Sequence, residues 1–319
     1  MSTPVEPEPS QSDEAARAGW MYYVGGMTQD HIARELGVSR QRAQRLVSRA
    51  MAEGLIHVRL NHRIASCLAL EKALTERFSL LRCRVVPSLG AGADPVDSIA
   101  PAAAAELERF LRLPDPLVIA LGTGRALRAM VDSVAPLEAE HHRLVSLIGN
   151  IAPDGSSSFF EVIMRLADKV RAPHYPMPVP VVTSTSEENA AFHALAPVRR
   201  VVDLARSADV TFVGVGQMGS DAPLRQDGFV TDAELSEMQN LGAVGEIAGW
   251  SFDSAGLYIE VGTNSRVGGV RVRAGSDRPV IGVAGGGHKV AAITAALKSR
   301  ILNGLITDEL TASEVLSHI

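Results

Sequence analysis

The sequence predicts an α/β protein of two parts, an N-terminal winged helix-turn-helix followed by a mostly parallel-sheet domain. Residues 28–53 carry two short amphipathic helical patterns separated by a tight turn. From about residue 81 onward, short β-rich runs alternate with helical runs, as in parallel α/β sheets. With 319 residues and 46% hydrophobic content, the chain is long enough for a small domain and a substantial core.

Composition and periodicity divide the chain into four segments. Residues 1–12 are expected to form a disordered tail, because prolines stand among acidic residues there without an apolar period. A helix over residues 13–23 is expected to turn Trp20 and Tyr23 inward. The remaining boundaries place a helix-turn-helix domain at 13–61, a linker helix that supports dimerisation at 62–80, and a ligand-binding and oligomerisation domain at 81–319.

The helix-turn-helix is predicted from its caps and its apolar spacing. Thr28 is a good N-cap for the first helix, Gly37 and Val38 make the turn, and Ser39 caps the second helix. One face of that second helix is apolar at the spacing expected for a buried stripe, through Ala43, Leu46, Val47 and Ala50. Gly54 ends the helix, and the alternating run at 55–60 is compatible with a wing strand.

The polar face of this second helix suits DNA. Arginine and glutamine can make bidentate contacts to guanine and adenine edges in the major groove. Residues 37–63 hold six arginines and one acid, although the whole chain has a formal charge of -5. A solvated face of an ordinary helical hairpin is the alternative, but the local charge favours phosphate binding. The expected DNA-binding residues are Thr28, Gln29, Ser39, Arg40, Gln41, Arg42, Gln44 and Arg45. Double-stranded DNA is the expected partner.

The second domain is predicted element by element. Strands are expected at 84–87, 117–121, 144–148, 178–182, 210–215, 279–283 and 305–306. Helices are expected at 94–111, 125–134, 159–171, 231–240 and 289–301. The run from Thr311 to Glu314 reads as a capping box that opens a final helix.

In parallel α/β sheets ligands bind at the carboxyl ends of the strands, so the loops there are the candidate sites. The loops at 121–125 and 284–289 are rich in glycine, and the second ends in Lys289, a combination that suits phosphate. Each loop is also compatible with a tight turn that binds nothing. The expected effector-binding residues are Gly122, Thr123, Gly124, Arg125, Asn150, Gln217, Glu246, Asp253, Gly285, Gly286, Gly287, His288 and Lys289.

Several other classes of site are not indicated. The loop at 121–125 is neither a dinucleotide fingerprint, since Leu127 stands where a third glycine belongs, nor a Walker loop. Cys67 and Cys83 lie outside any metal-binding or disulfide pattern and are interpreted as ordinary buried thiols. No cofactor and no metal is expected. No apolar run approaches the length needed to cross a bilayer, so we expect a cytoplasmic protein with no membrane partner.

These motifs, in this order and spacing, resemble the SorC-type family of bacterial transcriptional regulators of sugar catabolism. The resemblance is carried by the helix-turn-helix, by LGTGR at 121–125, RLADKVRAPHYPMPVP at 165–180, VGVGQMG at 213–219, GAVGEIAGWSFDSAG at 242–256, and AGGGHKVAAITAALKSRILNGLITDELTA at 284–312. It departs at Glu246, where many members have Asp, and at His288, where Glu or a small residue is common.

The resemblance implies an effector domain similar in fold to sugar-phosphate isomerases and deaminases, which binds a phosphorylated sugar or polyol and thereby controls operator binding. It also implies a homotetramer built as a dimer of dimers, and a pocket that includes residues 122–125, Glu246 and Lys289. We expect no enzyme activity. The alternative is an isomerase or deaminase with a DNA-binding appendage, in which Glu246 or Asp253 is the general base and His288 a second proton carrier.

Overall fold

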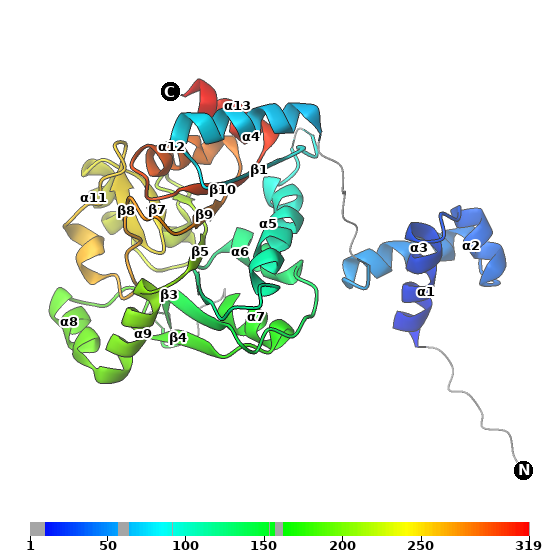
Figure 1. Cartoon of the computed structure of the whole chain (residues 1–319), viewed down its shortest axis with the longest axis horizontal. Coiled ribbons are helices and arrows are strands. Elements are labelled where there is room, and N and C mark those ends of the chain that lie inside the picture. Colours follow the sequence, from blue (N-terminus) through cyan, green and yellow to red (C-terminus); the bar gives the residue numbers. More distant parts are fainter. Residues whose placement is uncertain (1–9, 57–63, 91, 153, 157–161, 319) are drawn as a thin grey trace, which may run out of the picture. The chain divides into compact units, whose positions relative to one another are not determined.

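The computed structural model describes residues 10–56, 64–90, 92–152, 154–156 and 162–318, and the chain divides into two compact units, Met1–His62 and Arg63–Ile319 (Figure 1). The predicted class, a helix-turn-helix followed by a mostly parallel α/β domain, is confirmed. The expected wing strand falls largely on residues 57–60, which lie outside the described residues. Along the described residues, no helix is both long enough and apolar enough to cross a membrane.

The first unit is a three-helix bundle made of α1 (Gln11–Tyr23), α2 (Gln29–Glu35) and α3 (Arg40–Ala52). Its core joins alanines and aliphatic side chains of all three helices, including Ile32 and Leu46. As predicted, Thr28 and Ser39 cap α2 and α3 with their hydroxyl groups.

Two expectations for α1 were wrong. The helix begins at Gln11, inside the expected tail, because Ser10 and Asp13 form a capping box ahead of it. Trp20 is 57% exposed and Tyr23 is 40% exposed, so neither points into the core. The inner face of α1 is made of small residues instead. A Cβ on Gly19 would lie 2.7 Å from the Cβ of Ala50, so α1 and α3 approach too closely there for a large side chain.

The second unit is built on a seven-stranded sheet of order β1-β10-β9-β5-β2-β3-β4, in which all neighbouring strands are parallel. All seven predicted strands are present in it. Their bounds are β1 (Arg82–Val86), β2 (Val118–Leu121), β3 (Arg143–Ile151), β4 (His174–Pro180), β5 (Val210–Val213), β9 (Val280–Val283) and β10 (Gly304–Asp308).

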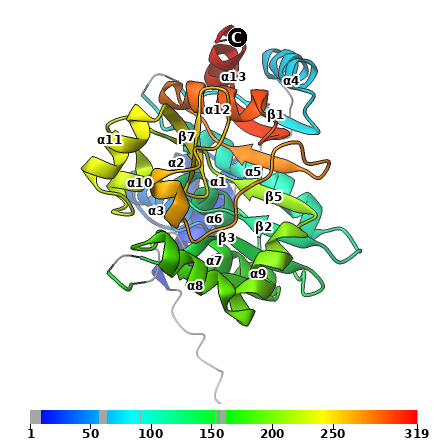
Figure 2. The ribbon, with the colours of Figure 1, turned by 90° about the vertical axis from the view of Figure 1, so that its left-hand side faces the viewer.

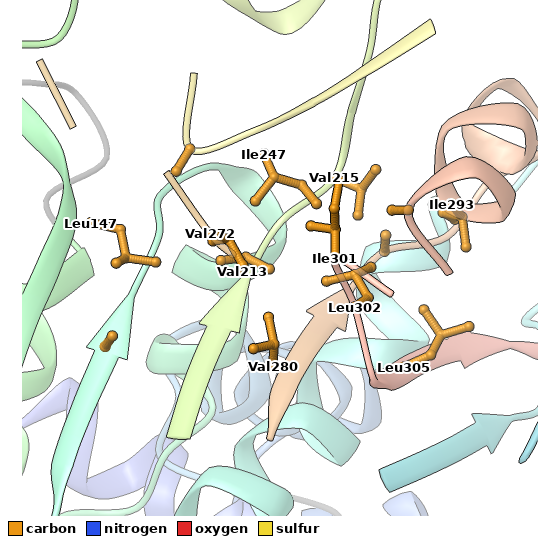
Figure 3. Close-up of a cluster of buried hydrophobic side chains, with 14 of the residues drawn as sticks. Leu147, Val213, Val215, Ile247, Val272, Val280, Ile293, Ile301, Leu302 and Leu305 are labelled. Carbon is orange, nitrogen blue, oxygen red and sulfur yellow. The ribbon is translucent and has the colours of Figure 1, made fainter. Parts of the chain in front are cut away.

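Helices cover both faces of this sheet, and each face has its own core. In β2, Ile119 and Leu121 enter one core while Val118 and Ala120 enter the other, as the alternation of side chains along a strand requires. The first core holds α5 (Pro95–Leu111), α6 (Arg125–Asp132) and α7 (Val162–Val170). The second holds α4 (Ala65–Phe78), α9 (Ala196–Arg206), α12 (Val290–Lys298) and α13 (Glu309–Ser317), and Figure 3 shows part of it.

The helix expected as a linker, α4, packs against α13 and β1 of the second unit and buries Leu74 completely. It therefore belongs to that unit. Both cysteines are free thiols: Cys67 on α4 is buried, whereas Cys83 on β1 is only half-buried by its exposed area. Burial nevertheless raises the pKa of the Cys83 thiol to about 12, which makes it a poor nucleophile.

The start of the final helix was predicted wrongly. Asp308, the last residue of β10, is its N-cap and accepts hydrogen bonds from the backbone N–H groups of Leu310 and Thr311. Thr311 lies inside the helix, where its buried hydroxyl accepts a hydrogen bond from Gly286 N–H at 2.7 Å. The aspartate at the strand end caps the helix three residues earlier than the expected box.

A second, three-stranded antiparallel sheet was not predicted. It contains β6 (Gly216–Gln217), β7 (Ala243–Ile247) and β8 (Trp250–Asp253), with β7 in the middle. The glycines around residue 245 hid it from sequence reasoning, because they suggest loop rather than strand. Helices α8 (Ser186–Ala194), α9 and α10 (Pro223–Gln226) and the 3-10 turns η1 (Gly262–Arg266) and η2 (Gly287–Lys289) were also missed, whereas α11 (Asp232–Asn240) lies where a helix was expected.

Candidate functional site

The order of the parallel strands places a crevice between β2 and β5. From β2 the chain winds outward through β3 and β4, and from β5 it winds the opposite way through β9 and β10. Loops that leave neighbouring strands in opposite directions separate at their carboxyl ends, and this point is where open α/β sheets bind ligands. A cavity of about 300 Å³ lies there.

The cavity brings together residues from loops far apart in the sequence. Of the residues expected to bind an effector, it is lined by Thr123, Gly124, Arg125, Gln217, Glu246, Gly285, His288 and Lys289. Polar residues that sequence reasoning missed line it too, namely Asp94, Asp221, Gln226 and Asp227. No sequence signal distinguishes these four, because Asp94 is a common helix cap and the other three lie on and beside the short helix α10.

The β2 loop opens α6 without a side-chain cap. Gly124 is the N-cap residue, and its φ of 110° lies in the region that favours glycine. The first N–H groups of α6 are thus at the cavity with no capping side chain to bind them, which is the arrangement that attracts an anion. Gly122 is used differently, because its N–H donates to Phe212 O at 2.8 Å.

The second glycine loop does not cradle the cavity as expected. Gly285 lines it, but a Cβ at this position would lie 2.6 Å from Asp308 Oδ2, so the glycine is required by packing. Gly286 donates its N–H to Thr311, and Gly287 lies against Glu314. Both glycines therefore contact side chains of α13. The part of this loop that reaches the cavity besides Gly285 is the pair His288 and Lys289.

Glu246 and Lys289 are two half-buried groups of opposite charge that line the cavity. Burial raises the pKa of Glu246, while a hydrogen bond from Gly249 N–H and the charge of Lys289 oppose that rise. Burial likewise lowers the pKa of Lys289, and the charge of Glu246 opposes the shift. Each charge thus opposes the shift of the other group toward its neutral form, and a ligand with hydrogen-bonding groups would replace the water that both have lost.

A second set of charges surrounds Arg125. Its guanidinium lies 3.4 Å from Gln226 Oε1, and its charge partly offsets the rise that burial causes in the pKa of Asp227. Asp221 accepts a hydrogen bond from Gln217 Nε2 at 2.8 Å, and Gln217 also accepts from Gly219 N–H. Gln217 is therefore held by its own loop.

Three further residues expected in the site lie outside this cavity. Asp253 accepts hydrogen bonds from the N–H groups of Ala255 and Leu257, both at 2.9 Å, and shapes the turn after β8, so it is outside the cavity lining and cannot serve as a base there. Asn150 and Gly122 line a smaller cavity beside α7, which shares Thr123 and Ile148 with the larger one. The Asn150 Oδ1 atom is buried without a hydrogen-bond partner among the described residues.

In the first unit, α3 presents an exposed polar face formed by Arg40, Gln41, Arg42, Gln44 and Arg45. Arg40 pairs loosely with Asp30 at 3.3 Å, and Arg45 Nε donates weakly to Gln41 O at 3.4 Å. Arg42 instead donates to Glu14 Oε2 of α1 at 2.9 Å, which fixes α3 against α1. Gln29 on α2 is half-buried.

Comparisons with known proteins agree with both units. The Sugar-bind family of sugar-binding domains matches residues 62–317, and the MarR family matches residues 18–63. The chain is 35% identical over 302 residues to the erythritol catabolism regulatory protein EryD of Brucella abortus (strain 2308), covering 95% of this chain and 96% of the relative. It is 32% identical to the transcriptional regulator LsrR of Enterobacter sp. (strain 638), covering 97% and 94% of the two chains.

Solved structures share the fold. The full-length sorbitol operon regulator SorC from Klebsiella pneumoniae superposes with a TM-score of 0.71 at 23% identity, over 97% of this chain and all of that one. A DeoR family transcriptional regulator from Listeria monocytogenes gives the same TM-score of 0.71 at 19% identity, over 78% of this chain and 99% of that one.

Proposed function

Because the chain belongs to the SorC-type family of sugar-binding transcriptional regulators, we propose that a phosphorylated sugar or polyol binds the cavity between β2 and β5 and thereby controls how α3 binds operator DNA. DNA binding by the first unit and sugar control by the second are properties of the family. The proposal adds where the effector binds and which residues hold it.

The proposal rests on one observation: two cationic side chains line the same cavity as the N-terminus of α6, which has no side-chain cap. Arg125 stands on the first turn of α6, and Lys289 faces the same cavity from η2. Helix N–H groups, a guanidinium and an ammonium together bind a phosphate well, since the helix dipole and both charges act in the same sense. We assign the phosphate of the effector to this side.

Carboxylates provide the hydroxyl-binding side. Glu246, Asp227 and Asp221 line the cavity with oxygen acceptors, and sugar or polyol hydroxyl groups are matching donors. Ionised Glu246 can accept from two hydroxyl groups while it keeps its bond to Gly249 N–H. A ligand with a charged end and a polyhydroxy body satisfies both sides, whereas a bare phosphate or a neutral polyol satisfies one.

On the DNA side we propose that Arg40, Gln41, Gln44 and Arg45 contact bases or phosphates from α3. Thr28, Gln29 and Ser39 lie at the starts of α2 and α3, where helix N–H groups favour phosphate contacts. Arg42 is assigned to fixing α3 against α1 through Glu14, in place of the DNA contact that its exposed position suggests. A homotetramer acting in the bacterial cytoplasm, where the operator lies, completes the proposal.

A thermal-shift panel of the full-length protein tests the effector assignment. We expect erythritol phosphate, chosen from the name of the EryD relative, to raise the midpoint of unfolding more than erythritol, because a ligand that binds only the native state stabilises it by mass action. The matched control is Lys298→Met, an exposed lysine of α12, against Lys289→Met. The phosphate assignment would be contradicted if erythritol and erythritol phosphate raised the midpoint of unfolding equally in Lys289→Met and in Lys298→Met. Recovery of the ligand unchanged after incubation is the expected sign that the protein does not catalyse its conversion.

A further inference from the structure

The cavity between β2 and β5 is called the effector cavity below, and the second unit, Arg63–Ile319, the effector unit. A second, larger cavity of about 540 Å³ lies in the effector unit, outside the effector cavity. It is bounded by α8 and α9, which lie side by side (Figures 1 and 2), by Trp250 of β8, by η1, and by the extended chain at 267–273. None of the residues assigned to the effector lines it. It therefore needs its own explanation.

The charge of this cavity is positive. Arg271 is already engaged, because it pairs with Glu260 at 2.8 Å and lies over the rings of Trp250 and Tyr258 at 5.5 and 5.3 Å. Arg206 and Arg273 also line the cavity, and within the described part of the chain neither has an ion pair or a side-chain hydrogen bond. With Arg271 neutralised by Glu260, two unpaired guanidinium groups remain. The lining of the effector cavity has the opposite net charge, since it holds two cationic side chains, Arg125 and Lys289, and four carboxylates.

Exposed arginines alone are usually a solvated surface, but two buried polar atoms of the same lining point to a ligand. The indole Nε1 of Trp250 is a donor and the Oδ1 of Asn189 is an acceptor, and neither has a hydrogen-bond partner among the described residues. Asn189 Nδ2 donates to the carbonyl oxygens of Ser265 and Val267 at 3.4 and 3.2 Å, which leaves Oδ1 unused. Buried polar groups are seldom left unpaired in a native structure.

We propose that this cavity is a second binding site for a small hydroxylated anion. Arg206 and Arg273 bind its carboxylate or phosphate group, as guanidinium groups do through paired N–H donors. Trp250 donates to the ligand and Asn189 accepts from its hydroxyl group, after the small side-chain adjustments that bring these atoms to the cavity surface. The ligand is distinct in chemistry from a neutral polyol, which would leave both cations unpaired.

The site is connected to the effector cavity through the β7–β8 hairpin. Glu246 and Gly249 line the effector cavity, and Trp250 is the next residue along the chain. A ligand that moves the hairpin at either end alters the other end, and such coupling is reciprocal between the two binding equilibria. Trp250 is therefore placed to report binding at the second cavity.

The test uses the full-length Trp20→Phe protein, in which Trp250 is the single tryptophan, since the chain has two. L-Malate and inorganic phosphate are titrated at constant ionic strength while Trp250 fluorescence is followed, with erythritol as the neutral probe and equilibrium dialysis as the second measurement. The variant is Arg206→Ala/Arg273→Ala. Its matched control is Arg143→Ala/Arg200→Ala, two exposed arginines outside both cavity linings.

We expect malate or phosphate to bind in the millimolar range or below, and the paired variant to bind about a hundredfold more weakly, or roughly tenfold for each lost charge-assisted contact. The control should bind as the parent does. Binding of malate alone identifies a carboxylate site, and binding of phosphate alone a phosphate site. The proposal is overturned if neither anion binds, if the paired variant binds as well as its control, or if Lys289→Met removes the binding by itself.

Discussion

The Oε2 atom of Glu246 accepts a hydrogen bond of 2.8 Å from the N–H group of Gly249 across the turn of the β7–β8 hairpin. Gly249 has a φ of 84°, and Ala248 before it has a φ of 52°, so this tight turn needs left-handed backbone at two consecutive residues. The carboxylate thus holds the hairpin closed and faces the effector cavity at the same time. An effector that binds Glu246 acts on a structural bond, which gives it a way to change the protein's shape.

Substitution of Glu246 separates these two roles. Glu246→Gln keeps an oxygen that can accept from Gly249, so the midpoint of thermal unfolding should change little, while effector affinity should fall by about tenfold or more because the charged acceptor is lost. Glu246→Asp shortens the side chain and should weaken both. Isothermal titration and thermal melts of the two variants measure this. Full effector affinity in Glu246→Gln would show that the charge is not used.

Lys289 should be required for the effector response and dispensable for DNA. Lys289→Met leaves Glu246 without the positive charge that lowers its pKa, so the carboxyl group should take up a proton at a higher pH than in the parent. We expect operator binding without effector to be retained and the release or recruitment by effector to be lost. Gel-shift titrations with and without the erythritol phosphate probe measure both, beside the Lys298→Met control. A normal effector response would place the phosphate elsewhere.

Arg42 and Arg45 should differ, although both are exposed on α3. Arg42→Ala removes a surface ion pair to Glu14, worth up to about 1 kcal/mol of unfolding free energy, and should change the salt dependence of DNA binding little. Arg45→Ala should reduce the slope of log affinity against log salt by about one, if Arg45 binds a phosphate. Fluorescence anisotropy on operator DNA over a salt series distinguishes them. An equal reduction of the salt slope in the two variants would contradict the assignment of Arg42 to the contact with Glu14, and an unchanged slope in Arg45→Ala would contradict a phosphate contact of Arg45.

Gly19 should tolerate no side chain. A Cβ there would lie 2.7 Å from Ala50 Cβ and 2.8 Å from Ile56 Cγ1, both in the core of the first unit. Gly19→Ala should therefore destabilise the helix-turn-helix by about 1–3 kcal/mol, the usual cost of overpacking. Ser48→Ala, on the exposed side of α3, is the control. Hydrogen exchange of α1 and α3 amides should accelerate in Gly19→Ala alone, and unchanged exchange would disprove the close packing.

His142 should make the effector unit less stable in acid. Its Nδ1 accepts from Leu117 N–H and its Nε2 donates to Leu111 O, so the neutral ring is the form that fits, and burial lowers its pKa from 6.5. The unfolded chain takes up the proton first as the pH falls. Stability from this group is therefore complete above pH 6.5 and declines below it, until the folded pKa is passed. Urea unfolding at a series of pH values should show this decline in the parent and not in His142→Gln, with His174→Gln, an exposed histidine of β4, as control.

The sequence by itself determined the elements that depend on neighbouring residues. The caps Thr28 and Ser39, the apolar stripe of α3 and the seven runs of the parallel sheet follow from local residue spacing, and the loops after parallel strands are where ligands bind. For this reason the loops that hold Arg125 and Lys289 are site candidates in the sequence itself, whereas Glu246 is a candidate through its own motif and the family resemblance, and lies on β7, a strand that was not predicted.

Only the tertiary structure decided which of the candidate groups are free to bind a ligand. Gly286 is bonded to Thr311 of α13, Asp253 is used by the turn after β8, and Arg42 is paired with Glu14. Asp227 and Asp94 enter the cavity without any motif to mark them. Each partner lies far along the chain or in an unpatterned turn. A hydrogen bond or a steric contact depends on the distance between two groups in space. Local sequence preferences do not report the distance between residues that are far apart in the chain.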